Sequence, residues 1–232
     1  ALSEITPCRR SEGKEIPAAI DRLITTNLFM TITNANFDYD RFSDRINETL
    51  SSRDELFEQL HDDTGLSDAA SWQYRTAEER TLKADKVGVL DTGNEDLCSL
   101  RELTLYGLKG MAAFNKHATV LCFADTAIDA FLQKALAKTL DDSLSTDDLT
   151  SLVLETGSFG VKVMALLDTA NTSTYGNPEI TKVELGVRNN HAILISGHDL
   201  RDLEMLLEQT ANTGVDVYNH SEMLPDNYYP AF

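Results

Sequence analysis

A histidine and a glutamate near the end of the sequence are the residues whose types and spacing best suit chemistry. His198 lies in the segment SGHDL (residues 196–200), and Glu222 follows 24 residues later in HSEMLP (residues 220–225). A neutral imidazole nitrogen and a carboxylate oxygen are both competent ligands for iron. The two residues are therefore a candidate pair for one shared metal site.

The pattern around this pair predicts a strand, a helix and a second strand. Residues 192–196 and 215–219 read as strands, and the residues between them have the apolar spacing of a helix. Parallel strands that are joined by a helix end at the same edge of a sheet, where open α/β sheets bind their ligands. Gly197 allows a sharp turn after the first strand. We therefore expect His198 and Glu222 to meet at one sheet edge.

Each motif also has an ordinary structural explanation. A histidine at a strand end is more often a capping or hydrogen-bonding group, and a carboxylate before Pro225 is more often an acceptor in a turn. Spacing alone favours these structural roles. A third possibility is a mononuclear metal site at His198 and Glu222, which would require at least one more ligand, and His220 is the obvious candidate.

Most of the first 175 residues read as helices. The expected helices span residues 16–33, 38–60, 95–114 and 126–140, with two more that begin at Ser145 and at Phe159. A turn-forming segment, YGNP (residues 175–178), then ends the helical region, and a short strand is expected at 183–187.

The predicted fold class is α plus α/β. It has a helical-bundle domain over residues 1–178, followed over residues 179–232 by the beginning of a Rossmann-like parallel α/β domain. Two details of the bundle are also predicted. Gly107 and Gly110 should let another helix approach closely, and residues 161–167, apolar nearly all round, should be buried among other helices.

Composition excludes several classes of partner. The formal net charge of the 232 residues is −18, so a nucleic acid or an anionic membrane would be repelled by the overall field. No apolar stretch is expected to cross a bilayer, and the first residues lack the pattern of a signal peptide. Three distant cysteines, Cys8, Cys98 and Cys122, indicate a reducing compartment. We expect a cytoplasmic protein, or one of an organelle matrix if an import segment preceded Ala1.

Several longer segments occur along the chain in one order: TITNAN (31–36), LREL (100–103), YGLKG (106–110), MALLD (164–168), TYGNPE (174–179), ILISGHDL (193–200), LEQT (207–210), GVDVY (214–218) and EMLP (222–225). Together they resemble the hybrid cluster protein family, also called prismane proteins or hydroxylamine reductases. The resemblance covers roughly residues 26–232, and several long motifs in register are far more specific than any one of them.

The resemblance implies a helical first domain of packed three-helix bundles, followed by α/β domains that hold an iron–sulfur–oxygen cluster, the hybrid cluster. The family's cluster ligands include the histidine of its SGHD motif and the glutamate of its GEMLP motif, which correspond here to His198 and Glu222. His220 does not correspond to a ligand. This chain has Ser221 where the family usually has glycine, which reduces the backbone freedom next to Glu222.

The resemblance also implies a reaction and its partners. Members of the family reduce hydroxylamine to ammonia and water, and reduction of nitric oxide has been proposed for them too. Electrons would arrive from a separate reductase or ferredoxin-like donor, through a second iron–sulfur cluster near the N-terminus.

The cysteines of this chain depart from the family's pattern. The second cluster should be held by four closely spaced cysteines, but only Cys8 precedes Thr26, and the cysteines that complete the hybrid cluster would lie beyond Phe232. Two ligands cannot assemble a sulfur-bridged cluster. We therefore expect an N-terminal piece of a reductase that is inactive and binds no cluster by itself. The alternative is a complete, non-catalytic paralogue that acts as a helical interaction module.

Overall fold

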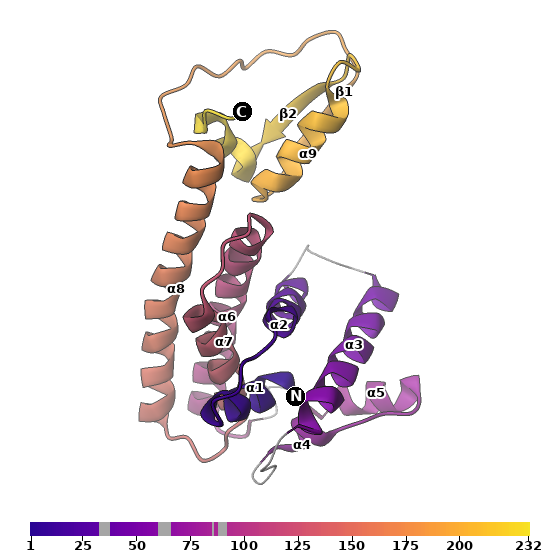
Figure 1. Ribbon diagram of the computed structural model, residues 1–232, viewed down its shortest axis with the longest axis vertical. Helices are drawn as coiled ribbons and strands as arrows, with labels where there is room; N and C mark the ends of the chain where they lie inside the picture. The colour runs from indigo at the N-terminus through magenta and orange to yellow at the C-terminus, as the bar shows by residue number, and fades with distance from the viewer. Residues whose placement is uncertain (33–37, 60–65, 85, 88–91) are drawn as a thin grey trace. The chain divides into compact units, whose positions relative to one another are not determined.

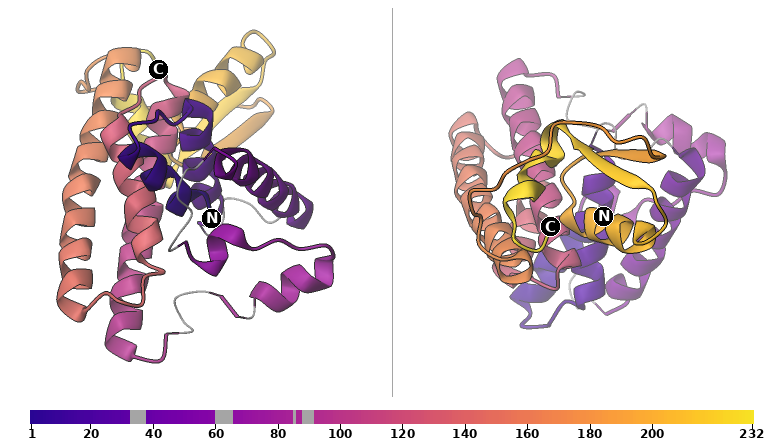
Figure 2. Two further views of the ribbon diagram at one scale, coloured as in Figure 1. Left: turned by 60° about the horizontal axis from the view of Figure 1, so that its bottom comes forward. Right: turned by 90° about the horizontal axis from the view of Figure 1, so that it is seen from above.

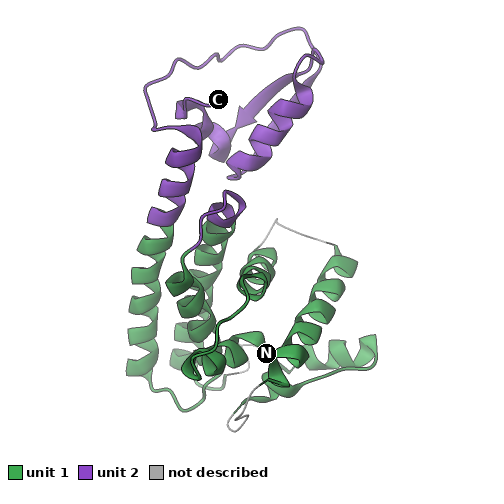
Figure 3. Ribbon diagram, in the orientation of Figure 1, with its two compact units in different colours: residues 1–116, 125–164 green, residues 117–124, 165–232 purple. Residues whose placement is uncertain are grey.

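The computed structural model describes residues 1–32, 38–59, 66–84, 86–87 and 92–232. The chain forms two compact units (Figure 3). Unit 1 comprises residues 1–116 and 125–164, and unit 2 comprises residues 117–124 and 165–232. The domain boundary at residue 178 stays a prediction.

Unit 1 is built from helices (Figure 1). They are α1 (Leu2–Ser11), α2 (Ala18–Met30), α3 (Tyr39–Phe57), α4 (Asp68–Ser71), α5 (Ala77–Ala84), most of α6 (Glu95–Val120), α7 (Thr126–Lys138) and the first part of α8 (Thr146–Tyr175). Side-chain caps explain several of the helix starts, because a carboxylate before a helix accepts an otherwise unpaired backbone N–H. Asp38 accepts from the amide of Arg41 at 3.1 Å, and Asp125 accepts from the amide of Ala127 at 2.8 Å.

Four helix predictions for this region are confirmed with small shifts of their ends. The expected helices at 16–33, 38–60, 95–114 and 126–140 correspond to α2, α3, α6 and α7. The predicted break at residues 34–36 and the predicted end at residue 60 lie outside the described residues. Helices α1, α4 and α5 were not predicted; Pro7 inside α1 removes a backbone donor and hides the helical pattern.

The helix expected from Ser145 is confirmed at its start, because α8 begins at Thr146 and Oγ of Ser145 accepts from the amide of Asp148 at 3.2 Å. The expected break before a second helix at Phe159 is wrong, because α8 runs without interruption for 30 residues. Gly157 lies between the two predicted helices and weakens the local helix propensity. A single glycine does not end a helix whose turns before and after it are held by packing. The expected burial of residues 161–167 is also wrong. Val163 is fully buried, whereas Val161 and Met164 are 62% and 47% exposed. The helix buries one face only.

Helix α8 also corrects the expectation that no segment could cross a bilayer. It has the length and the apolar composition of a membrane span. A single helix of this kind is weak evidence for a membrane span, because core helices of soluble proteins have the same length and composition.

Unit 2 contains a parallel strand–helix–strand arrangement. Strand β1 (Ala192–Ser196), helix α9 (Leu200–Thr210) and strand β2 (Asp216–His220) follow in order, and a 3-10 helix, η2 (Ser221–Tyr228), comes next. The strands pair in parallel, with Ala192 opposite Asp216 and Ser196 opposite His220. The two predicted strands and the helix between them are confirmed. The fold is thus helical with a small two-stranded parallel sheet, as the α plus α/β class requires.

The strand expected at residues 183–187 is wrong. The structure gives this segment no regular secondary structure, and Leu185 and Val187 are 93% and 83% exposed. A strand needs a hydrogen-bonded neighbour, and the sheet in the described part of the chain pairs only β1 with β2. Alternating apolar residues alone therefore did not produce a strand here.

A small apolar core holds unit 2 together. Helix α9 lies along one face of the strand pair (Figure 2), and its Leu200 and Leu203 pack near Ile195 of β1 and Val217 of β2. The same cluster includes buried Tyr175, Met223 and Tyr229. The core thus joins the end of α8 and the first turn of η2 to the face of the sheet that α9 covers.

Candidate functional site

The structure brings the predicted pair together at the edge of the sheet. The distance between Nε2 of His198 and Oε2 of Glu222 is 3.4 Å, and the two side chains are 64% and 65% exposed. Both residues follow strand ends that face each other, since Ser196 of β1 is paired with His220 of β2. The parallel topology therefore explains how residues 24 positions apart come into contact.

The turn after β1 is fixed by its glycine and by a helix cap. Gly197 has φ +132°, a conformation that residues with a Cβ rarely adopt. Asp199 then caps α9: its Oδ1 accepts from the amides of Arg201 at 2.9 Å and Asp202 at 3.3 Å. His198 lies between these two constraints, so the backbone that carries its imidazole is held from both sides.

The turn after β2 is held by different contacts. Ser196 Oγ donates to the carbonyl oxygen of His220 at 3.1 Å, which ties the two strand ends together. Ser221 then has φ +54°, in the left-handed region. Met223 is buried in the core of unit 2, whereas Glu222 before it extends from the surface. One turn thus exposes the carboxylate and anchors the next side chain.

A second histidine–carboxylate contact involves Asp199, the residue that follows His198. Nδ1 of His117, in the last turn of α6, is 3.2 Å from Oδ2 of Asp199. Burial would raise the pKa of Asp199, but the hydrogen bond and charge of His117 and the two α9 amides outweigh it, so that the pKa is lowered. Sequence reasoning missed His117, because no local signal links residues 82 positions apart.

The described residues contain no group of three or more His, Cys, Asp or Glu side chains that could hold a metal ion. His220 therefore does not complete a three-ligand site with His198 and Glu222, as the mononuclear alternative required. The pair itself suits an iron centre as far as its chemistry goes, because it offers one nitrogen and one oxygen donor that converge in solvent-accessible space. It can supply two ligands of a larger set.

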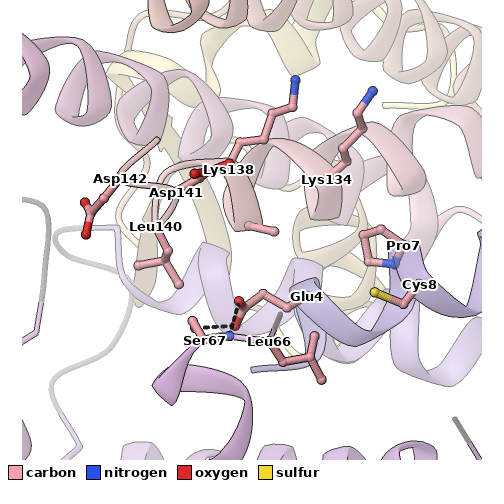
Figure 4. Close-up of a pocket in the computed structure, with 11 residues that line it drawn as sticks. Glu4, Pro7, Cys8, Leu66, Ser67, Lys134, Lys138, Leu140, Asp141 and Asp142 are labelled. Carbon is pink, nitrogen blue, oxygen red and sulfur yellow. Dashed lines mark hydrogen bonds between the residues drawn. The ribbon is translucent and has the colours of Figure 1, made fainter. Parts of the chain in front are cut away.

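A separate pocket in unit 1 does not offer comparable chemistry (Figure 4). It has a volume of about 410 Å³ and is lined by residues of α1 and α7 and by the segments that follow α3 and α7. Glu4 accepts from the amide and the hydroxyl of Ser67 at 3.1 and 2.8 Å, and Lys134 and Lys138 extend away from these bonds. The carboxylate of Glu4 is thus engaged in holding α4 to α1.

The sequence also matches known proteins over its whole length. The family model of the Prismane/CO dehydrogenase family matches residues 6–232. The hydroxylamine reductase of Desulfovibrio desulfuricans is 60% identical over 231 residues, which cover 100% of this chain and 42% of that protein. The hydroxylamine reductases of Clostridium perfringens and Desulfitobacterium hafniense are 56% and 59% identical, over 96% and 92% of this chain and 42% and 40% of their own lengths. The chain thus spans about two fifths of the length of these relatives.

Proposed function

The chain belongs to the Prismane/CO dehydrogenase family, and we propose that it is part of an enzyme that reduces hydroxylamine. The observation that carries this proposal is the 3.4 Å contact of His198 with Glu222, within a chain that is 60% identical to a hydroxylamine reductase. Because the relatives are more than twice as long, the remaining part of such an enzyme would lie outside these residues.

In this proposal, His198 and Glu222 provide a nitrogen and an oxygen ligand to a hybrid iron–sulfur–oxygen cluster. The sulfur ligands and a second iron–sulfur cluster would come from other parts of a longer protein. When bound, the cluster would supply electrons and an iron position open to hydroxylamine. Strands β1 and β2 would begin a larger, Rossmann-like parallel sheet, with the cluster at its carboxyl edge.

The residues around the pair have tasks that need no bound cluster. Gly197 and the Asp199 cap set the direction of the His198 backbone, and buried Met223 anchors the turn that presents Glu222. Both ligand side chains point into solvent-accessible space, so a substrate of the size of hydroxylamine can reach them.

The proposed reaction consumes two electrons and two protons for each hydroxylamine and releases one ammonia and one water. The electrons would come from a separate reductase or a ferredoxin-like donor, and nitric oxide is a second possible substrate. An enzyme with iron–sulfur clusters, on a chain whose three cysteines lie far apart in the sequence, fits a reducing, cytoplasmic location, which is also part of this proposal.

The test starts from the coding sequence on both sides of this segment. A continuing frame with further cysteines would be expressed anaerobically, and its iron, its sulfide and its hydroxylamine-dependent oxidation of a reduced viologen dye would be measured. His198→Ala and Glu222→Ala should each abolish turnover and lower the iron content. His191→Ala, an exposed histidine just before β1, should change neither. A cluster-loaded enzyme that does not turn over hydroxylamine, or full activity in His198→Ala, would reject the proposal.

A second candidate is a non-catalytic paralogue that serves as a helical interaction module. Ser221 favours it, because a residue with a Cβ stands at φ +54° beside Glu222, where glycine would fit without strain. Stop codons that directly flank this segment would support the paralogue. A continuing frame with four closely spaced cysteines upstream would reject it.

A further inference from the structure

We infer that His117 is a positioning residue for the proposed ligand His198 and that it acts through the carboxylate of Asp199. The inference rests on the proposed function, because it concerns how one of the two proposed cluster ligands is held. It adds a residue from a distant part of the chain, at the end of α6, to the carboxyl edge of the sheet.

The two oxygens of Asp199 perform different tasks. Oδ1 accepts both amides at the start of α9, whereas Oδ2 faces Nδ1 of His117 at 3.2 Å. A carboxylate only accepts hydrogen bonds, so Nδ1 of His117 is the donor in this contact. Asp199 is therefore fixed between the start of one helix and the end of another. Because His198 is the preceding residue, its backbone is restricted as well.

The exposure of the His198 side chain makes this backbone anchor important. With 64% of its surface open to solvent, the imidazole has few neighbours that could restrict its rotation. Gly197, on its other side, permits the sharp turn but has no side chain that could form further contacts. Side-chain contacts that control the orientation of His198 are thus available on the Asp199 side.

His117 is itself held firmly enough to act as an anchor. Its side chain is only 14% exposed, and Leu121 on the same turn packs against the core of unit 2. The helix end is closed by backbone bonds: the amides of Leu121 and Phe123 donate to the carbonyl oxygen of Ala118 at 3.1 and 3.0 Å. Partners of this kind around a metal ligand fix its orientation and strengthen metal binding.

Three variants of the 232-residue chain separate positioning from folding. His117→Leu removes the donor but keeps a side chain that can pack, and His117→Asn keeps an N–H close to the position of Nδ1. Asp199→Ser retains an N-cap for α9 but is too short to reach His117. His191→Leu is the control, because the residue is exposed and its hydrogen bond to β2 is made by the backbone, where the carbonyl oxygen of His191 accepts from the amide of Asp216.

The first measurement is the order of the His198 ring, from NMR relaxation of its Cε1–H group. His117→Leu and Asp199→Ser should increase the motion of the ring, whereas His117→Asn and His191→Leu should leave it as in the parent chain. The amides of α9 should stay protected from exchange in every variant. If the ring of His198 is equally ordered in His117→Leu with α9 intact, the inference is wrong.

The second measurement is titration with Co²⁺, followed by paramagnetic broadening of His198 and Glu222. His117→Leu should weaken the binding about tenfold, the lower end of the loss seen when a partner of a metal ligand is removed, and His117→Asn should restore it. If no broadening is seen in the parent chain, the result counts against His198 and Glu222 as ligands. The order of the His198 ring then remains the test of the role of His117. Broadening with equal affinity in His117→Leu would contradict the inference alone.

Discussion

Gly107 of α6 packs directly against Thr156 of α8. A Cβ atom at residue 107 would lie 2.7 Å from Cγ2 of Thr156, closer than two carbon atoms can approach. Thr156 is buried, and its hydroxyl donates to the carbonyl oxygen of Leu152 at 2.8 Å, so rotation of the side chain would break that bond. The predicted close packing is confirmed at Gly107. At Gly110, a Cβ would meet no neighbouring atom of the described chain within 4 Å beyond the backbone of its own helix. The predicted close packing is therefore wrong at Gly110.

Gly107→Ala should therefore destabilise unit 1. Overpacking costs about 1–3 kcal/mol, against a gain of about 1 kcal/mol in helix propensity from replacing glycine, so the net loss is up to about 2 kcal/mol. Gly110→Ala is the matched control in the same helix, and it should raise the free energy of unfolding by up to about 1 kcal/mol. Urea denaturation of both variants measures the difference. Equal shifts in the same direction would show that the contact with Thr156 imposes no packing constraint.

Met223 and Leu224 provide a test of the anchor behind Glu222. Met223 is 2% exposed in the core of unit 2, whereas Leu224 is 55% exposed. Met223→Ala should cost about 2–5 kcal/mol, because it leaves a cavity beside α9, and Leu224→Ala should cost less than about 0.5 kcal/mol. Hydrogen exchange of the α9 amides reads out the stability of this unit. Similar exchange rates in the two variants would contradict the assigned core.

Asp129 makes the stability of unit 1 depend on pH. Burial of its carboxyl raises the pKa to about 6, against the hydrogen bond from Asn115 and with a further contribution from the charge of Asp21. The unfolded chain releases this proton near pH 4, whereas the folded chain keeps it until about pH 6. Stability is therefore lost as the pH rises from about 4 to 6, by up to about 3 kcal/mol.

Asp129→Asn should remove most of this loss. The asparagine side chain keeps an oxygen that can accept from Nδ2 of Asn115, as Oδ1 of Asp129 does at 2.8 Å in the parent chain. It has no charge to desolvate. The variant should be more stable than the parent chain at pH 8 and closely similar at pH 4, in urea denaturation at both pH values. Asp44→Asn, the same exchange at an exposed position of α3, is the control. An equal or larger benefit at pH 4 would contradict the buried-charge explanation.

The sequence predicts best where the structure is decided by neighbouring residues. Strand β1, helix α9 and strand β2 follow local apolar patterns and a capping aspartate, and the parallel connection then places His198 beside Glu222 by topology alone. The contact of the two side chains was therefore predictable, although their role as ligands stays a prediction.

Prediction fails where tertiary contacts decide the outcome. Helix α8 continues through Gly157 because its buried face packs along its length, and residues 183–187 stay irregular because no described strand pairs with them. His117 meets Asp199 only because the core of unit 2 holds the end of α6 against α9. None of these contacts leaves a pattern in the nearby sequence.

Ser221 is the position where a single substitution should improve the site. Its φ of +54° is strained for a residue with a Cβ, at a cost of about 1 kcal/mol, and glycine adopts this conformation freely. Ser221→Gly should therefore stabilise the turn next to Glu222, partly offset by the greater freedom of glycine in the unfolded chain. Ser221→Ala keeps the Cβ and is the matched control. Hydrogen exchange of η2 and α9 should slow only in Ser221→Gly, and equal exchange in both variants would show that the positive φ carries no strain.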